Sequence, residues 1–136
     1  MKFTKKQIER YSRQIILKKI GVIGQKKLLK SSVLIVGAGG LGSPIAIYLA
    51  ALGIGKIGII DKDNIEISNL SRQIIFSTND LKKNKSSTAI SKLKKINPDI
   101  QFKSFNKKLT KKNINPIAKN FDLIVDGSDN FRTRFL

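Results

Sequence analysis

Ser32 to Asp61 reads SVLIVGAGGLGSPIAIYLAALGIGKIGIID, and this stretch decides the fold. A largely β-branched apolar run, Val33 to Val36, leads into a glycine-rich turn. An apolar segment and a second apolar run, Ile57 to Ile60, follow. Pro44 suits the first turn of a helix, where a missing backbone N–H costs nothing. The pattern predicts strand, turn, helix and strand, which form one right-handed βαβ unit of a parallel sheet.

The turn after the first run has the chemistry of a phosphate-binding loop. Gly37 and Gly39 let the backbone turn tightly and approach a phosphate, and Gly42 lets the helix pack closely on the strand. The helix N-terminus offers unpaired N–H groups and a partial positive charge to an anion. Asp61 stands where an acidic residue would reach a ribose hydroxyl. These features predict nucleotide binding; the alternative is a βαβ unit whose glycines serve packing only.

Length and composition narrow the class of protein. The 136 residues predict a single domain (1–136), in which 1–30 form a helical extension and 31–136 the α/β core. No apolar run is long enough to span a membrane, and no apolar signal core follows the basic N-terminus, so we expect a cytoplasmic protein with no membrane partner. The sequence contains no cysteine and no histidine. This excludes disulfides, thiolate zinc sites and cysteine nucleophiles, and it removes the commonest general base.

Charge is the most unusual feature of the composition. The net charge is +18, but the lysines are spread along the whole chain, which indicates a residue bias and no specific nucleic-acid partner. The nine acidic residues are more informative. Asp61, Asp63, Asp126 and Asp129 fall at or just after the ends of two apolar runs. Carboxylates there suggest a ribose or metal site; ordinary loop and cap chemistry is the alternative.

Two further strands complete the predicted sheet, one around 100–104 and one at 122–126. Doubly wound topology places the strands in the order 3-2-1-4, with helices on both faces of a Rossmann-like parallel sheet. The switch point then lies between the first and fourth strands. The glycine turn after the first strand and 127–130 after the fourth should therefore flank the same crevice.

The helical segments are less regular in sequence. The residues TKKQ at 4–7 fit a capping box. The glycines within 21–24 break the apolar pattern, so the second helical piece is expected only at 25–30. Thr110 is expected to cap a weak helix that Pro116 limits.

Several segments together resemble the ThiF/MoeB/HesA adenylyltransferases, relatives of the ubiquitin-activating enzymes. They keep the family's order and approximate spacing over nearly the whole chain. An ordinary dehydrogenase has no reason to carry S-N-L-x-R-Q or D-x-x-D-N. The matching segments are Arg10-Tyr11-Ser12-Arg13-Gln14, Gly37 to Gly42, Asp61-Lys62-Asp63, Ser68-Asn69-Leu70-Ser71-Arg72-Gln73, Lys85, Asn97-Pro98 and Asp126-Gly127-Ser128-Asp129-Asn130.

The resemblance implies a reaction, cofactors and partners. The family uses ATP and Mg²⁺ to adenylate the C-terminal carboxylate of a ubiquitin-like sulfur-carrier protein, releasing pyrophosphate, in molybdopterin or thiamine biosynthesis. It also implies a homodimer. The basic residues in these motifs suit that reaction, because bringing a carboxylate to a phosphate requires cations that neutralise and align the two anions. No protein nucleophile or general base is needed for that step.

The resemblance also implies roles for individual residues. Asp61 would hold the ribose, and Asp129 would bind Mg²⁺ (the only metal ligand implied). Arg13 would reach the neighbouring subunit's ATP. The implied catalytic residues are Arg13, Arg72, Lys85 and Asp129. The implied nucleotide-binding residues are Gly37, Gly39, Gly40, Gly42, Asp61, Asp63, Ser68, Asn69, Arg72, Lys85, Asp129 and Asn130.

The chain also departs from the family pattern. Ser71 stands where the family usually has Gln, and Lys83 and Asn84 replace a Gly and a Pro before Lys85. Family members are longer, with more strands, a cysteine and often paired zinc-binding motifs, so the resemblance covers a truncated, N-terminal part without a zinc site. Two alternatives stay open: a truncated, non-catalytic nucleotide- or partner-binding module, and an NAD-dependent oxidoreductase. The sequence does not decide whether this chain is active by itself.

Overall fold

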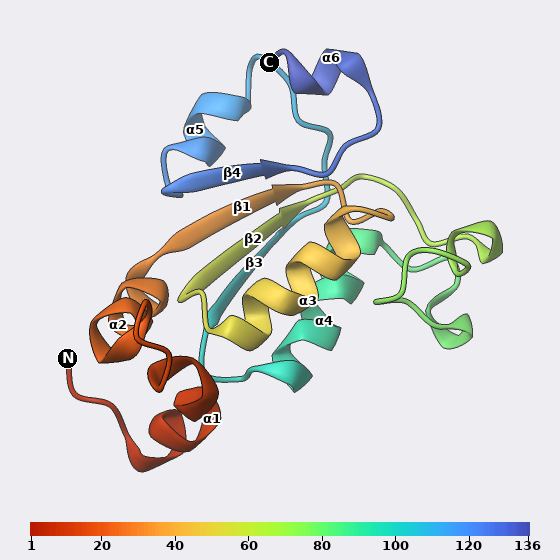
Figure 1. The fold of residues 1–136 in the computed structure, drawn as a ribbon. Coiled ribbons are helices and arrows are strands. Elements are labelled where there is room, and N and C mark those ends of the chain that lie inside the picture. Colours follow the sequence, from red (N-terminus) through yellow and green to blue (C-terminus); the bar gives the residue numbers. More distant parts are fainter.

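The computed structural model describes the backbone of all 136 residues and every side chain except that of Phe131. Four parallel strands form one sheet in the order β3-β2-β1-β4, with helices packed on both faces (Figure 1). This confirms the doubly wound α/β architecture predicted from the sequence. The elements are α1 (Lys5–Ile15), α2 (Gly21–Lys30), β1 (Ser32–Val36), α3 (Gly42–Leu52), β2 (Lys56–Ile60), the 3₁₀ turns η1 (Ile67–Asn69) and η2 (Thr78–Asp80), α4 (Lys85–Ile96), β3 (Gln101–Phe105), α5 (Ile114–Ala118), β4 (Leu123–Asp126) and α6 (Phe131–Arg134).

The sheet separates two apolar clusters, because successive side chains of a strand point to opposite faces. On β1, Val33 and Ile35 face the larger cluster under α3 and α4, while Leu34 and Val36 face the smaller one beside α5. Val36 is paired with the last residue of β2 and with Asp126 at the end of β4. The strands therefore end together at one edge of the sheet, where the loops that follow them meet.

The N-terminal helices are fastened to the ends of α3 and α4. The Tyr11 ring is fully buried against Gly53, and its hydroxyl accepts a hydrogen bond of 2.9 Å from Asn97 Nδ2. Gln25 is also fully buried and donates to the Leu52 carbonyl at 2.9 Å. The predicted capping box at 4–7 is present at the start of α1. These contacts hold α1 and α2 at the end of the sheet where the strands begin (Figure 1).

The boundaries predicted for two helices are wrong. α2 begins at Gly21, because tertiary packing around buried Gln25 outweighs the weak helix propensity of glycine. The helix near 110 is capped at Asn113, and Thr110 precedes it by a turn. Pro116 lies in the first turn of α5, where its missing N–H costs no intrahelical bond, so it does not end the helix. Among the described residues, no helix is long and apolar enough to cross a membrane.

The long loop between β2 and α4 is anchored by a buried carboxylate, Asp80. Burial alone would raise the pKa of Asp80, but the Lys92 ammonium at 2.8 Å and the N–H and hydroxyl of Ser77, each at 2.9 Å, outweigh burial. They lower the pKa from 3.8 to about 2. The contact ties the end of the loop to the middle of α4.

This anchor predicts a pH-dependent stability. Because the folded-state pKa lies below the unfolded one, the contribution of the ionised carboxylate is complete above about pH 4 and is lost as the pH falls toward 2. We expect Asp80→Asn to lower the free energy of unfolding by about 2 kcal/mol at neutral pH. Denaturant unfolding should show this difference shrinking between about pH 4 and 2.5. A difference that stays constant over that interval would contradict the assignment.

Candidate functional site

At Gly37 and Gly42, the glycine turn after β1 meets backbone atoms that leave no room for a side chain. Gly37 has φ +89°, and a Cβ atom on it would lie 3.0 Å from the carbonyl oxygen of Gly127, in the turn after β4. A Cβ atom on Gly42, the first residue of α3, would lie 1.8 Å from the Gly37 oxygen. The turns after β1 and β4 are thus packed against each other at the switch point, as the sequence predicts.

The S-N-L-x-R-Q segment meets the other side of the same turn. The stem of Arg72 lies 3.6 Å from where a Cβ atom of Gly40 would stand, and Gln73 Nε2 lies 3.6 Å from that of Gly39. Arg72 Nη1 donates a 3.0 Å hydrogen bond to the Ser68 carbonyl, which orients the guanidinium. Two segments distant in sequence, the turn after β4 and the S-N-L-x-R-Q segment, therefore converge on the glycine turn.

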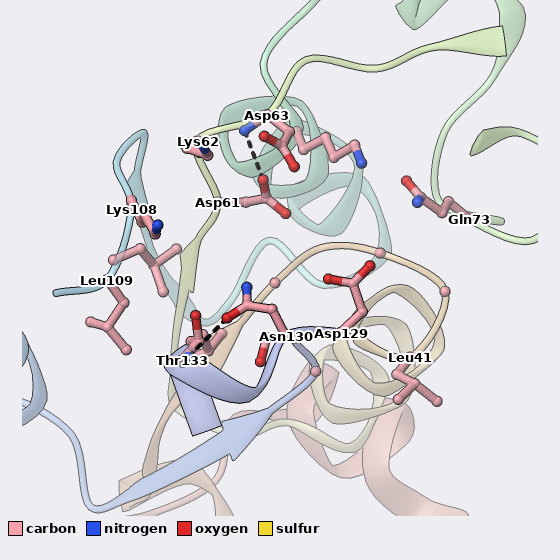
Figure 2. Close-up of a pocket in the computed structure, with 18 of the residues that line it drawn as sticks. Leu41, Asp61, Lys62, Asp63, Gln73, Lys108, Leu109, Asp129, Asn130 and Thr133 are labelled. Atoms are coloured by element: carbon pink, nitrogen blue, oxygen red, sulfur yellow. Dashed lines mark hydrogen bonds between the residues drawn. The ribbon is translucent and has the colours of Figure 1, made fainter. Parts of the chain in front are cut away.

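Between these segments lies an open cavity of about 530 Å³ at the ends of the strands. Gln73 and Asp129 lie toward the side of Leu41, while Lys108 and Leu109 stand on the opposite side (Figure 2). Six cationic side chains face three carboxylates, so the lining favours an anion. Its charged residues are Asp61, Lys62, Asp63, Arg72, Lys85, Lys107, Lys108, Asp129 and Arg134.

Asp61 holds the backbone of the cavity wall in place. One carboxylate oxygen accepts a 2.8 Å hydrogen bond from the Ala38 N–H in the glycine turn, and the other accepts one of 2.8 Å from the Asp63 N–H (Figure 2). Each oxygen keeps a second lone pair for a hydroxyl donor. The carboxylate is therefore rigidly placed and still able to accept from a ribose.

The turn after β4 contributes Asp129 and Asn130. The Asp129 carboxylate points into the cavity, while Asn130 Oδ1 accepts from the Thr133 N–H at 2.9 Å and caps α6 (Figure 2). Among the described residues, no three or more His, Cys, Asp or Glu side chains lie close enough together to hold a metal ion. Mg²⁺ is commonly held by one or two carboxylates together with substrate phosphates, so a single Asp129 in a cavity with a largely cationic lining fits that ion.

Lys85 lies in the cavity wall, although the two residues before it depart from the family pattern. It is the first residue of α4, its backbone N–H donates to the Asp63 carbonyl at 2.9 Å, and its side chain is 7 % exposed in the cavity wall. Asn84 caps the helix through a 3.1 Å hydrogen bond from the Ser87 N–H. Among the side chains that the structure describes, the Lys85 ammonium has no ion-pair partner.

Four residues of the predicted set do not line the cavity as the structure describes it. Gly42 is buried at the start of α3, where it packs against Gly37. Asn69 Oδ1 accepts a 2.9 Å hydrogen bond from the Glu66 N–H, so its side chain closes the η1 turn. Ser68 contributes its carbonyl to Arg72. Arg13 is exposed on α1, at the opposite end of the sheet. The remaining predicted residues are brought together around one cavity.

The sequence reasoning missed the wall after β3. Lys107, Lys108 and Leu109 line the cavity next to Asp61 and Lys62. The sequence could have indicated these residues, because they follow a predicted strand whose end lies at the same edge of the sheet as the glycine turn. The resemblance implies no role for Gln73, yet its side chain is 4 % exposed in the cavity wall and its Oε1 has no hydrogen-bond partner among the described residues.

Comparison with known proteins matches this arrangement to one family. The model of the ThiF family matches residues 11–136. This chain belongs to the ThiF family. A sulfur carrier protein adenylyltransferase of Thermus thermophilus is 43 % identical over 136 residues, which are 100 % of this chain and 50 % of that protein. A probable molybdopterin-synthase adenylyltransferase of Porphyra purpurea is 48 % identical over 134 residues, 98 % of this chain and 35 % of its own length. This ThiF-family chain thus spans half or less of the length of these relatives.

Solved structures show the same fold. The E. coli tRNA N6-threonylcarbamoyladenosine dehydratase TcdA in complex with ATP superimposes with a TM-score of 0.90 at 24 % identity, covering 98 % of this chain and 55 % of TcdA. E. coli MccB with ATP gives 0.72 at 35 % identity, over 79 % of this chain and 33 % of MccB. Both matched structures contain ATP.

Proposed function

We propose that this ThiF-family chain binds ATP with Mg²⁺ in the cavity at the strand ends and serves the adenylation of a sulfur-carrier protein. One observation carries the proposal: the turns after β1 and β4 converge with Arg72 and Lys85 on one cationic cavity that also presents Asp129. The names of the relatives and the ATP in two matched structures support it.

Different residues of the cavity would contact different parts of a bound nucleotide. We infer that Asp61 accepts from the ribose, while the glycine turn and the N-terminus of α3 face the phosphates. Arg72 presents a planar fork and Lys85 a point charge to phosphate oxygens. Asp129 is the carboxylate that would hold Mg²⁺, which when bound neutralises phosphate charge.

The proposed reaction needs alignment more than proton transfer. A carboxylate oxygen at the carrier's C-terminus forms a bond to the α-phosphorus, and the bond from that phosphorus to the bridging oxygen breaks. The electron pair leaves on pyrophosphate, so no protein group gains or loses a proton. Arg72 and Lys85 would reduce the repulsion between the two anions and hold them in line. This agrees with a sequence that contains neither cysteine nor histidine.

Carrier-dependent exchange of labelled pyrophosphate into ATP tests the proposal. We expect label to enter ATP only when Mg²⁺ and a sulfur carrier with an intact C-terminus are both present. A carrier lacking its last two residues is the matched control. ATP binding without any exchange would contradict adenylation by this chain and would favour a non-catalytic nucleotide-binding module.

We further propose that two copies of the chain complete the site. Arg13 lies far from its own cavity, and its family role requires a neighbouring subunit. The helices next to it expose apolar side chains that a second copy would cover. α3 is apolar almost all round, yet its Tyr48 and Leu52 are exposed, as is Ile16 beyond α1.

Mixing two inactive variants tests this arrangement. Arg13→Ala and Asp129→Ala should each abolish pyrophosphate exchange. After mixing and subunit exchange, each heterodimer regains one complete site, so about a quarter of the wild-type exchange should return. A shared site would be contradicted if the mixture recovered no exchange activity. It would also be contradicted if light scattering showed a monomer that still catalyses exchange.

A further inference from the structure

Asn84 forms more side-chain hydrogen bonds than its place before a helix requires. Its Oδ1 accepts from the Ser87 N–H at 3.1 Å and from the Ser86 hydroxyl at 2.7 Å. Its Nδ2 donates to the carbonyls of Asp61 at 3.3 Å and Asp63 at 3.2 Å. The reverse orientation of the amide would set its oxygen against two carbonyl oxygens, so the pattern fixes which way the group points.

A third segment is held by the same amide. Asn84 Nδ2 also donates to Asn106 Oδ1 at 2.8 Å, and Asn106 is followed by Lys107 and Lys108 of the cavity wall. The amide of Asn84 therefore joins the ends of β2 and β3 to the start of α4.

Each joined segment carries side chains of the cavity, yet Asn84 is not among the residues described as lining it. Asp61 and Asp63 follow β2, Lys85 opens α4, and two lysines follow Asn106. An interaction that holds groups in place without touching the ligand can still matter, since a misplacement of 1 Å costs about 100-fold in a reaction.

Resting on the proposed ATP site, we propose that Asn84 is a positioning residue: its side-chain amide sets the relative placement of Lys85, Asp61 and the lysines after β3. The helix cap and the placement of the cavity wall use different atoms of Asn84, Oδ1 for the cap and Nδ2 for the wall. They can therefore be separated by substitution.

Asn84→Ser is the decisive variant, because serine is a good N-cap but has no group to replace Nδ2. Calorimetric titration with ATP and Mg²⁺ should show affinity reduced about 10-fold, with little change in melting temperature. Asn97→Ser is the matched control. Asn97 lies at the other end of α4, fully buried, where its Nδ2 donates to the Ala50 carbonyl at 2.8 Å. It should lower the melting temperature and leave the affinity of the folded protein unchanged.

A double-mutant cycle shows whether Asn84 acts through Lys85. If Lys85→Met alone weakens ATP binding about 30-fold, the double variant should lose about 50-fold, well short of the 300-fold product of independent effects. Wild-type affinity in Asn84→Ser, or fully multiplicative losses, would overturn the positioning role while leaving the ATP site intact. A wild-type chain that binds no ATP would overturn the proposed function and this inference together.

Discussion

Gly42→Ala is expected to prevent stable folding of this chain. The added Cβ atom would lie 1.8 Å from the Gly37 oxygen, a backbone atom that cannot rotate away. Relief requires α3 to move off the sheet, and α3 packs on the main apolar cluster through buried Ala46 and Ala50. We expect a loss of at least about 3 kcal/mol in the free energy of unfolding, measured by denaturant titration.

Gly40→Ala is the matched control, two residues earlier in the same turn. Its Cβ atom would meet only the flexible stem of Arg72, at 3.6 Å, which is ordinary van der Waals contact. The fold should survive, and the change should appear as weaker ATP binding, because Gly40 lines the cavity. Equal stability of the two variants would show that the Gly37–Gly42 contact does not limit the packing of α3.

Asp129→Ala is expected to remove the dependence of ATP binding on Mg²⁺. In the wild type Mg²⁺ should strengthen ATP binding, and the variant should lose about 100-fold in affinity when Mg²⁺ is present. With Mg²⁺ chelated, the variant should bind ATP as well as the wild type or better, since a carboxylate no longer faces the phosphates. Calorimetric titration under both conditions measures the effect.

Asp99→Ala controls for the loss of a carboxylate elsewhere. Asp99 lies outside the cavity, 3.4 Å from Arg10 and 3.9 Å from Lys6. Its removal should leave the affinity for ATP within about two-fold of the wild-type value, because solvent and salt screen the charge of Asp99 from the cavity. Equal losses in both variants would refute the assignment of Mg²⁺ to Asp129.

The sequence predicts those parts of the site whose residue types are required by the local backbone or by direct contact with a ligand. Gly37, Gly42 and Asp61 are recognisable because a tight turn, a close helix and a ribose-facing acid each require one residue type at one spacing. The strand order then follows from the topology of parallel sheets, and it predicts that the turns after β1 and β4 meet.

What the sequence could not supply depends on tertiary contacts. In the sequence Asn84 is only a departure from the family pattern, and its contacts with the ends of β2 and β3 appear only in the fold. α2 starts before its apolar pattern does, because the buried side chain of Gln25 fixes it against Leu52. The resemblance places Asn69 among the nucleotide-binding residues, and in the structure its amide oxygen closes a local turn. A polar side chain can bind a ligand or form a local hydrogen bond with the backbone, and its neighbours in space decide between the two.

The central claim, that the cavity at the strand ends is a Mg²⁺-dependent ATP site, is tested most directly by titrating the chain with ATP and with NADH side by side. Both ligands would use the glycine turn and Asp61, but only a triphosphate with Mg²⁺ needs Arg72, Lys85 and Asp129. The account predicts ATP binding that Mg²⁺ strengthens and that is lost in Arg72→Ala, with NADH binding at least about 100-fold weaker. Tight NADH binding with no ATP binding would contradict it.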